Sequence, residues 1–225
     1  MSRFLVAMLW AALPAIAARP LTTEDASILE EKACQLEAWV DGGQGATQYW
    51  MVPACNFGAS IEWQAGLAKT HSAGRTQFSE AYAQAKSAWP LGPAWSIGAV
   101  VGVTRRPLQA LASGWDNPYA IIPMSASFGS TAVHVNAGWI KDREAARNAF
   151  TWGLAAERRI SSRTTLLAEA FGENGARPYL RAGARYSAWA DRLDLDLSMV
   201  TRAGGGQADR LISLGLLFQA GRFLP

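Results

Sequence analysis

The sequence has few of the residues on which most catalytic and metal-binding sites depend. Only two histidines and two cysteines occur in 225 residues, and charged residues make up 17% of the chain. A phosphate-binding loop, a Cys-x-x-Cys motif and a His-Glu-x-x-His motif are all missing. The pair Asp194-x-Asp196 lacks the glycine-containing loop of a calcium site. We therefore expect neither a metal nor a cofactor.

Long apolar runs are also missing, apart from one at the N-terminus. Arg3 precedes an apolar run from Phe4 to Ile16, and Ala15-Ile16-Ala17 is a small-residue cleavage pattern. These features predict a secretory signal peptide over residues 1–18, too short for a spanning helix. No later stretch reaches eighteen consecutive apolar residues, so strands must make any membrane crossing. A net charge of +3 gives no reason to expect a nucleic-acid partner.

What the sequence does contain is a polar–apolar alternation of period two, which is typical of strands. The segment from Leu193 to Val200 is an example, because its leucines alternate with Asp194, Asp196 and Ser198. A soluble sheet over a core would show this pattern, and so would a barrel wall with lipid outside and water inside. The fourth candidate strand would also make a helix. The twelve candidates are 33–41, 47–55, 59–69, 76–87, 94–104, 118–128, 131–140, 148–159, 163–172, 178–189, 192–202 and 210–223.

The lengths of the predicted loops favour the barrel. Odd-numbered hairpins are longer than even-numbered ones, with Ala88 to Pro93 as the exception, as in a barrel whose two ends lie in the periplasm. The ten tryptophans fit the aromatic belts at the two membrane interfaces. We therefore predict an all-β fold, a transmembrane antiparallel up-and-down β-barrel of about 12 strands over residues 33–225. It would lie in bacterial outer-membrane lipid as a monomer.

The loop positions also predict which charged residues face each other. A two-residue loop at Ala190-Asp191 sets Arg185 opposite Asp196, and a loop from Glu173 to Arg177 sets Glu169 opposite Arg181. Opposite charges across a strand pair contribute roughly 0.2–1 kcal/mol each and help to fix register.

The two cysteines flank a third predicted hairpin. A loop from Gly42 to Ala46 sets Cys34 opposite Cys55. Because an exported chain reaches an oxidising compartment, we predict a disulfide between them.

Two segments at the ends of the mature chain carry further predictions. Residues 19–32 are polar and acidic without periodicity, which favours a mobile periplasmic arm and leaves a position in the barrel mouth as the alternative. The last strand alternates up to the aromatic Phe223, followed by Leu224-Pro225. Terminal strands of bacterial outer-membrane barrels end in an aromatic residue that the assembly machinery recognises, so this machinery is an expected partner.

About a third of the chain resembles a known family. The quoted segments are Glu169-Ala-Phe-Gly-Glu-Asn-Gly, Arg177-Pro178, Arg181 to Tyr186, Asp191 to Ser198, Arg19 to Asp25 and Ala33 to Trp39. They are similar to the small outer-membrane proteins grouped under the meta-pathway of phenol degradation. The resemblance implies a barrel that passes small organic molecules, and it brings no catalytic motif.

The inward faces give the candidate site residues. A twelve-stranded lumen is narrow, so long polar side chains could line a solute pathway, or could neutralise one another and stiffen the wall. Both interpretations remain open. We predict these pore-lining residues: Glu62, His134, Asn136, Glu157, Glu169, Arg181, Arg185, Asp194 and Asp196.

We predict a narrow pore or transporter for small molecules, with organic and aromatic solutes as the candidate class, and two other functions remain open. A structural or adhesive barrel would use the long loop from Arg105 to Asn117. A lipid hydrolase would need a serine beside a histidine, and Ser125 and Ser127 neighbour the strand of His134. The outer-membrane phospholipase pattern has a serine two residues after its histidine, where this chain has Asn136. We therefore expect no enzymatic activity.

Overall fold

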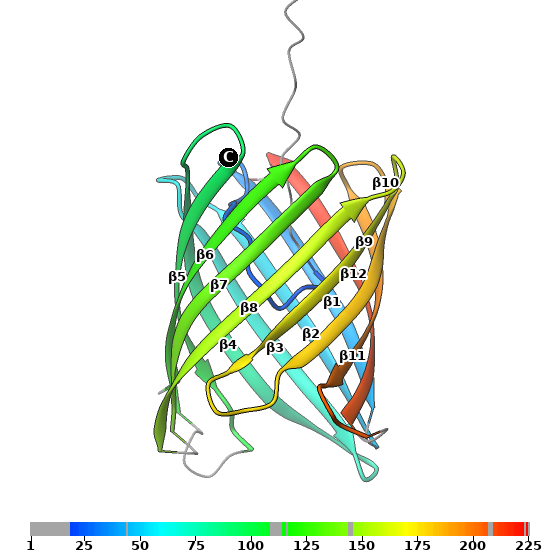
Figure 1. Ribbon diagram of the computed structural model, residues 1–225. Helices are drawn as coiled ribbons and strands as arrows, with labels where there is room; N and C mark the ends of the chain where they lie inside the picture. The colour runs from blue at the N-terminus through cyan, green and yellow to red at the C-terminus, as the bar shows by residue number, and fades with distance from the viewer. Residues whose placement is uncertain are drawn as a thin grey trace, which may run out of the picture.

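The computed structural model describes residues 19–43, 45–108, 114–115, 117–143, 146–206, 209–222 and 224. They form a closed barrel of twelve antiparallel strands, in which β1 pairs with both β2 and β12 (Figure 1). This confirms the predicted all-β up-and-down barrel. The signal peptide and Phe223 lie outside the described residues. The strands are β1 Ala33–Gly43, β2 Ala46–Asn56, β3 Glu62–Ser72, β4 Arg75–Pro90, β5 Trp95–Arg105, β6 Asn117–Phe128, β7 Thr131–Asp142, β8 Arg147–Arg159, β9 Thr164–Glu173, β10 Tyr179–Trp189, β11 Leu193–Arg202 and β12 Arg210–Arg222.

The outer wall of the barrel is apolar. Along β11 and β12, Leu197, Ile212 and Leu214 each expose more than half of their surface, while the intervening Ser198 and Ser213 are buried inside. Trp63, Val101, Ile122 and Phe150 are exposed in the same way on four other strands. Such a surface matches the lipid-facing band of a transmembrane barrel. Among the described residues, no helix is long and apolar enough to cross a membrane.

The predicted pairing of the strands is confirmed in three hairpins. Cys34 lies opposite Cys55, Glu169 opposite Arg181, and Arg185 opposite Asp196. The fourth candidate segment, for which a helix was also possible, is the strand β4, with sixteen residues. Period-two patterning therefore fixes register wherever one face of the strand meets lipid.

The predicted loop lengths were wrong in several hairpins. Only residues 44–45 connect β1 to β2, and only 73–74 connect β3 to β4, because these strands continue further than the alternation indicates. The turn predicted at Ala190-Asp191 spans 190–192, with a bulge between Ser187 and Trp189. Asp191 has a φ of 58° in this turn. The extra strand residues, among them Gly42, Gly43 and Ser72, carry no large apolar side chain, so the alternation ends before the strand does.

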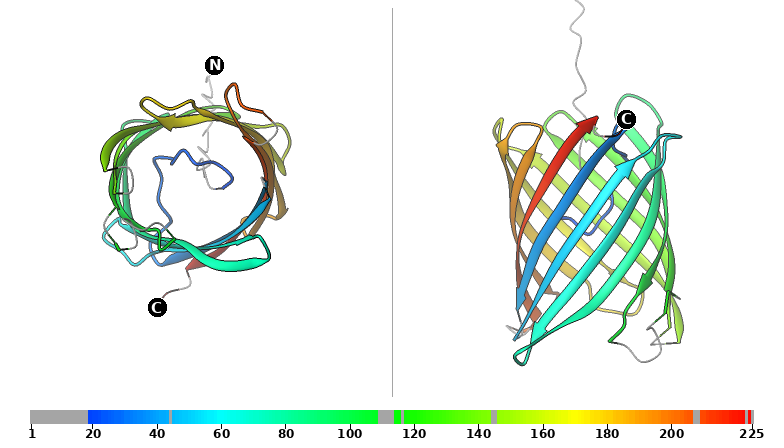
Figure 2. Two further views of the ribbon diagram at one scale, coloured as in Figure 1. Left: turned by 90° about the horizontal axis from the view of Figure 1, so that it is seen from below. Right: turned by 180° about the vertical axis from the view of Figure 1, so that it is seen from behind.

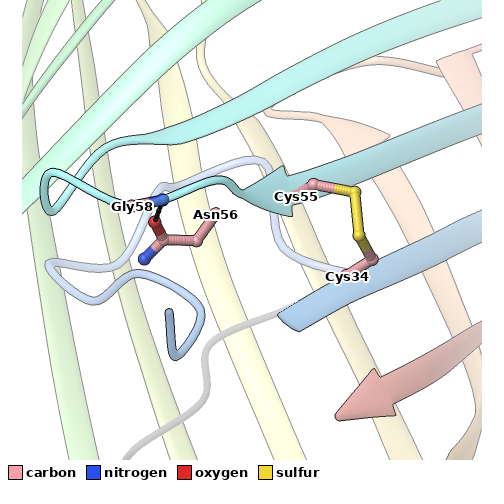
Figure 3. Close-up of a disulfide and its surroundings, with 4 residues drawn as sticks. All are labelled: Cys34, Cys55, Asn56 and Gly58. Carbon is pink, nitrogen blue, oxygen red and sulfur yellow. Dashed lines mark hydrogen bonds between the residues drawn. A yellow bond between two sulfur atoms is a disulfide. The ribbon is translucent and has the colours of Figure 1, made fainter. Parts of the chain in front are cut away.

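The predicted disulfide joins the start of β1 to the end of β2. Cys34 and Cys55 are bonded, with a sequence separation of 21 residues (Figure 3). Close to them, the Asn56 side chain accepts a hydrogen bond of 2.9 Å from the Gly58 N–H. The disulfide therefore secures the end of the barrel at which β1 begins and β12 ends, called here the C-terminal end. The opposite end is called the far end.

Residues Arg19–Lys32, called here the N-terminal segment, lie within the barrel. The view along the barrel shows this segment as irregular, bent chain inside the ring of strands (Figure 2). Arg19, Thr23, Asp25 and Ala26 are each at least nine-tenths buried. The interior of the barrel at this level is therefore occupied by the protein itself.

Candidate functional site

The N-terminal segment follows no regular secondary structure, so its backbone groups need partners on the wall. The Glu169 carboxylate accepts hydrogen bonds from the backbone N–H groups of Thr22, at 2.8 Å, and of Thr23. The Asn136 amide accepts from the Glu24 N–H and donates to the Glu24 carbonyl, both at 2.7 Å. Inward side chains of β7 and β9 thus replace the ladder that a strand would have supplied.

Arg19 is held by the strands β1, β11 and β12. Its guanidinium lies 3.3 Å from an Asp196 oxygen, donates to the Ser213 hydroxyl at 2.7 Å, and stacks 3.9 Å from the centre of the Trp39 ring. Burial lowers the pKa of this guanidinium, and the charge of Asp196 opposes the shift. Because arginine is protonated throughout the physiological pH range, the group remains a cation that needs these partners.

The backbone of Arg19 is bound as well. Arg185 donates two hydrogen bonds to the Arg19 carbonyl, at 2.9 and 2.6 Å, and pairs with Glu157 at 2.9 Å. Two of the predicted pore-lining residues, on β8 and β10, therefore meet at the start of the segment.

Acidic residues of the segment bind a lysine on β4. Lys86 pairs with Glu24 at 3.0 Å and with Asp25 in a second short contact. Gln84 donates to the same Glu24 carboxylate at 3.0 Å. Since Lys86 is 6% exposed, an unpaired ammonium here would be costly, and the two carboxylates offset that cost.

Ser125 and His134, weighed as a catalytic pair, lie next to each other on β6 and β7. The Ser125 hydroxyl is 2.7 Å from His134 Nδ1, and it accepts a hydrogen bond of 2.8 Å from the Ala26 N–H. His134 is 0% exposed, and its Nε2 is buried without a hydrogen-bond partner among the described residues. The pair is covered by the N-terminal segment and binds its backbone.

The segment leaves the lumen at the C-terminal end of the barrel, beside the turn that joins β2 to β3. Leu29 donates its N–H to Glu62 at 2.8 Å, and its carbonyl accepts from the Asn56 side chain at 2.7 Å. Lys32 then donates its N–H to the Asn56 carbonyl at 2.8 Å, just before β1 begins.

Eight of the nine predicted site residues belong to this arrangement. Glu62, Asn136, Glu169, Arg185 and Asp196 contact the N-terminal segment directly. Glu157, Arg181 and His134 contact those residues or Ser125, and Arg181 lies 3.5 Å from Glu169. Asp194 is half-buried on β11, two residues from Asp196.

The sequence analysis missed other residues of the arrangement. Lys86 and Gln84 lie on β4. Because a helix was also possible for this segment, the sequence did not determine which of its side chains point inward. Arg19 lies in the segment without periodicity, and its partner Asp196 is 177 positions away. The acidic and basic residues on the two sides were visible in the sequence, but nothing in the sequence paired them.

A cavity of about 600 Å³ lies between the N-terminal segment and the far end of the barrel. Thr22 to Glu24 line the side of the cavity that faces the C-terminal end. Its walls include the aromatic residues Trp50, Tyr82, Tyr119, Phe171 and Tyr179. Tyr82 on β4 and Tyr179 on β10 come from opposite sides of the ring, because these strands are six places apart in the closed order. The volume lies within the range of about 300–1,000 Å³ that small-molecule sites occupy.

Several solved structures share the fold. The chain matches a structure named KdgM porin with a TM-score of 0.66 at 8% identity, covering 82% of this chain and 98% of the other. A second structure of that porin, in complex with disordered oligogalacturonate, gives 0.62 at 8% identity, with 82% and 98% covered. The NanC porin gives 0.60 at 9% identity, with 83% and 100% covered. A closed barrel with this fold and an apolar outer wall is a protein of the bacterial outer membrane.

Comparisons of sequence give one family. Among curated proteins, none matches the chain. A family model described as uncharacterised conserved protein UCP029691 matches residues 5–219. The resemblance to the meta-pathway proteins is thus supported as far as a porin-like outer-membrane barrel, and the matching family model carries a different description.

Proposed function

We propose that this chain, which belongs to the family described as uncharacterised conserved protein UCP029691, is a narrow pore or transporter for small molecules. The observation that carries the proposal is a polar lumen reduced to a cavity of about 600 Å³ by the N-terminal segment. A twelve-stranded wall encloses more space than its own inward side chains fill, and residues 19–32 take up part of the remainder.

The inward polar residues have a double role in this proposal. Glu62, Asn136 and Glu169 hold the N-terminal segment, and the segment determines the width of the passage. The two interpretations from the sequence, a lined pathway and a stiffened wall, are then compatible. Because the buried cations Arg19, Lys86 and Arg185 are each paired with a carboxylate, the constriction would be polar without a free cation at these three positions.

The solute is expected to be small. The resemblance to meta-pathway proteins implies small organic molecules, and one structural neighbour is a porin in complex with oligogalacturonate. A cavity with several aromatic rings fits a small organic molecule better than it fits a hydrated ion. Passage within a single barrel requires no second chain, so we propose a monomer.

Two other functions receive less support. A non-conducting structural or adhesive barrel would have no use for a cavity bounded by a fixed internal segment. A lipid hydrolase would need Ser125 and His134 to reach a substrate, and both are buried under the N-terminal segment. We propose a non-enzymatic protein for that reason.

Planar-bilayer conductance tests the pore. In one variant residues 20–31 are deleted, and in a second they are replaced by a Gly/Ser stretch of equal length, which keeps the chain but removes the Glu24 and Asp25 side chains that bind Lys86 on the wall. We expect discrete openings in the wild type and at least severalfold larger openings in both variants. Leu197→Ala, on the outer wall, is the matched control and should conduct like the wild type.

The folded state of each variant is checked by its mobility in electrophoresis before and after heating. Silence of all folded variants, with the internal segment removed, would contradict the pore and favour the non-conducting barrel. Equal conductance of wild type and deletion would show that residues 19–32 do not set the width.

A further inference from the structure

We propose that the cavity between the N-terminal segment and the far end of the barrel is a binding site for a small aromatic carboxylate. The inference deepens the pore function and rests on it for the route by which the ligand enters. It depends on three features of the cavity: its aromatic rings, two arginines without a carboxylate partner, and a bottom formed by the protein's own chain.

The charges of the cavity do not balance locally. Each of its three acidic side chains already has a cation: Glu173 pairs with Arg147, Glu80 with Arg106 at 3.6 Å, and Glu24 with Lys86 at 3.0 Å. Two more guanidiniums, those of Arg177 and Arg202, also line the cavity. Within the part of the chain that the structure describes, no carboxylate lies within ion-pair distance of either. The cavity therefore favours an anion.

The two arginines occupy one side of the cavity. Arg202 on β11 lies directly opposite Tyr179 on β10, and its guanidinium is 5.1 Å from the centre of that ring. Its Nε atom is buried and has no hydrogen-bond partner among the described residues. Arg177 donates one hydrogen bond to the Gly204 carbonyl, at 3.0 Å. Guanidiniums offer paired N–H groups that match the two oxygens of a carboxylate.

Flat rings lie beside this cationic group. Phe171 and Tyr179 stack on each other, with centroids 5.4 Å apart and planes 19° apart. Across the lumen, Tyr82 and Trp50 form a second aromatic wall, with centroids 6.1 Å apart. Offset and edge-to-face contacts between aromatic rings are favourable beyond the area that they bury, so a ligand with a ring gains such contacts on both sides.

The bottom of the cavity explains why an anion would stop there. Thr22 and Thr23 line the cavity, and their N–H groups are already bound to Glu169. Glu24 also lines the cavity, and together with Asp25 it shares the single cation Lys86, so this cluster keeps one surplus negative charge that would repel an anion moving further. A ligand held by Arg177 and Arg202 would thus remain above the N-terminal segment.

Calorimetric titration of the full-length mature protein in detergent micelles tests the site without requiring conductance. The probes are benzoate, cyclohexanecarboxylate, benzyl alcohol and glucuronate, which separate the ring from the charge and an aromatic acid from a sugar acid. We expect benzoate to bind most tightly. Arg202→Gln and Arg177→Gln should each weaken benzoate at least about tenfold, because a hydrogen bond to a charged group is lost.

Arg159→Gln is the matched control, since it removes an exposed arginine at the C-terminal end of the barrel and should bind benzoate like the wild type. Tyr179→Leu should weaken benzoate more than cyclohexanecarboxylate. Equal binding of benzoate by wild type and Arg202→Gln would overturn the site, and tighter binding of glucuronate would overturn the aromatic class. Conductance without benzoate binding would support the pore and contradict the binding site. Benzoate binding without conductance would support the binding site and contradict the pore.

Discussion

Gly153 on β8 is a residue at which the backbone of the wall approaches the N-terminal segment closely. A Cβ atom built there would lie 2.4 Å from the Thr23 hydroxyl oxygen and 3.2 Å from the Thr23 Cβ. Thr23 cannot easily withdraw, because its backbone N–H is bound to Glu169. Glycine is therefore required at this position because the segment packs against its Cα. It is not required by the backbone angle, since φ lies outside the left-handed region.

Gly153→Ala should loosen the N-terminal segment. Overpacking of a close contact typically costs about 1–3 kcal/mol, so we expect amide hydrogen exchange of residues 20–31 to accelerate on the order of tenfold. Mass spectrometry of the peptides that cover this segment gives the rate. Gly206→Ala is the control, because nothing lies within 4 Å of the added Cβ.

The double variant Gly153→Ala with Thr23→Ala should recover much of the protection. The Thr23 hydroxyl is buried without a hydrogen-bond partner among the described residues, so its removal breaks no polar contact. Unchanged exchange in Gly153→Ala would show that the segment does not rest against β8.

Individual site residues were predictable only where strand period determined their direction. Glu62, Glu169 and Arg185 follow from alternation on strands whose other face is apolar. Trp50, Tyr82 and Tyr179 did not, because abundant aromatic residues in a barrel are expected in the interfacial belts rather than inside. All three lie within the predicted strands 47–55, 76–87 and 178–189, so their chemical type, and not the extent of the strands, kept them out of the predicted lumen.

At the scale of elements, local pairing was predictable and long-range pairing was not. A hairpin loop fixes the register of the strands that it joins, which is why Cys34 met Cys55 and Arg185 met Asp196 as predicted. The N-terminal segment has no such loop. Its side chains and backbone groups go to partners on different strands, so no repeat appears in its sequence.

The disulfide between β1 and β2 belongs to the same scale. A bond that closes a loop with a sequence separation of 21 should stabilise the folded barrel by about 3 kcal/mol in the chain-entropy model. We expect Cys34→Ser with Cys55→Ser to unfold at a lower urea concentration than the oxidised protein in lipid vesicles. Wild type with reductant should resemble the variant. An identical midpoint for all three would mean that the β1–β2 ladder alone holds this hairpin.

At the scale of the molecule, the two ends of the barrel are different. The β6–β7 turn lies at the end where β1 starts and β12 finishes, while the β3–β4 turn lies at the far end, beyond the cavity (Figure 1). With the chain ends in the periplasm, the cavity would open toward the outside of the cell.

Cysteine labelling of intact cells tests this orientation. The described part of the natural chain has no free cysteine, so an added one is a clean target. Ala73→Cys, in the β3–β4 turn, should react with a membrane-impermeant maleimide on intact cells. Ser130→Cys, in the β6–β7 turn, should react only after the outer membrane is permeabilised. The opposite result would mean that the cavity faces the periplasm.

The N-terminal segment also bears on the order of assembly. Its contacts reach Asn56 on β2, Lys86 on β4, Asn136 on β7, Glu169 on β9 and Ser213 on β12. These side chains form one surface only after the first and last strands have met, and contacts so distant in sequence form late. The N-terminal segment, which enters the periplasm first, would then dock last, after β1 and β12 have paired and closed the barrel.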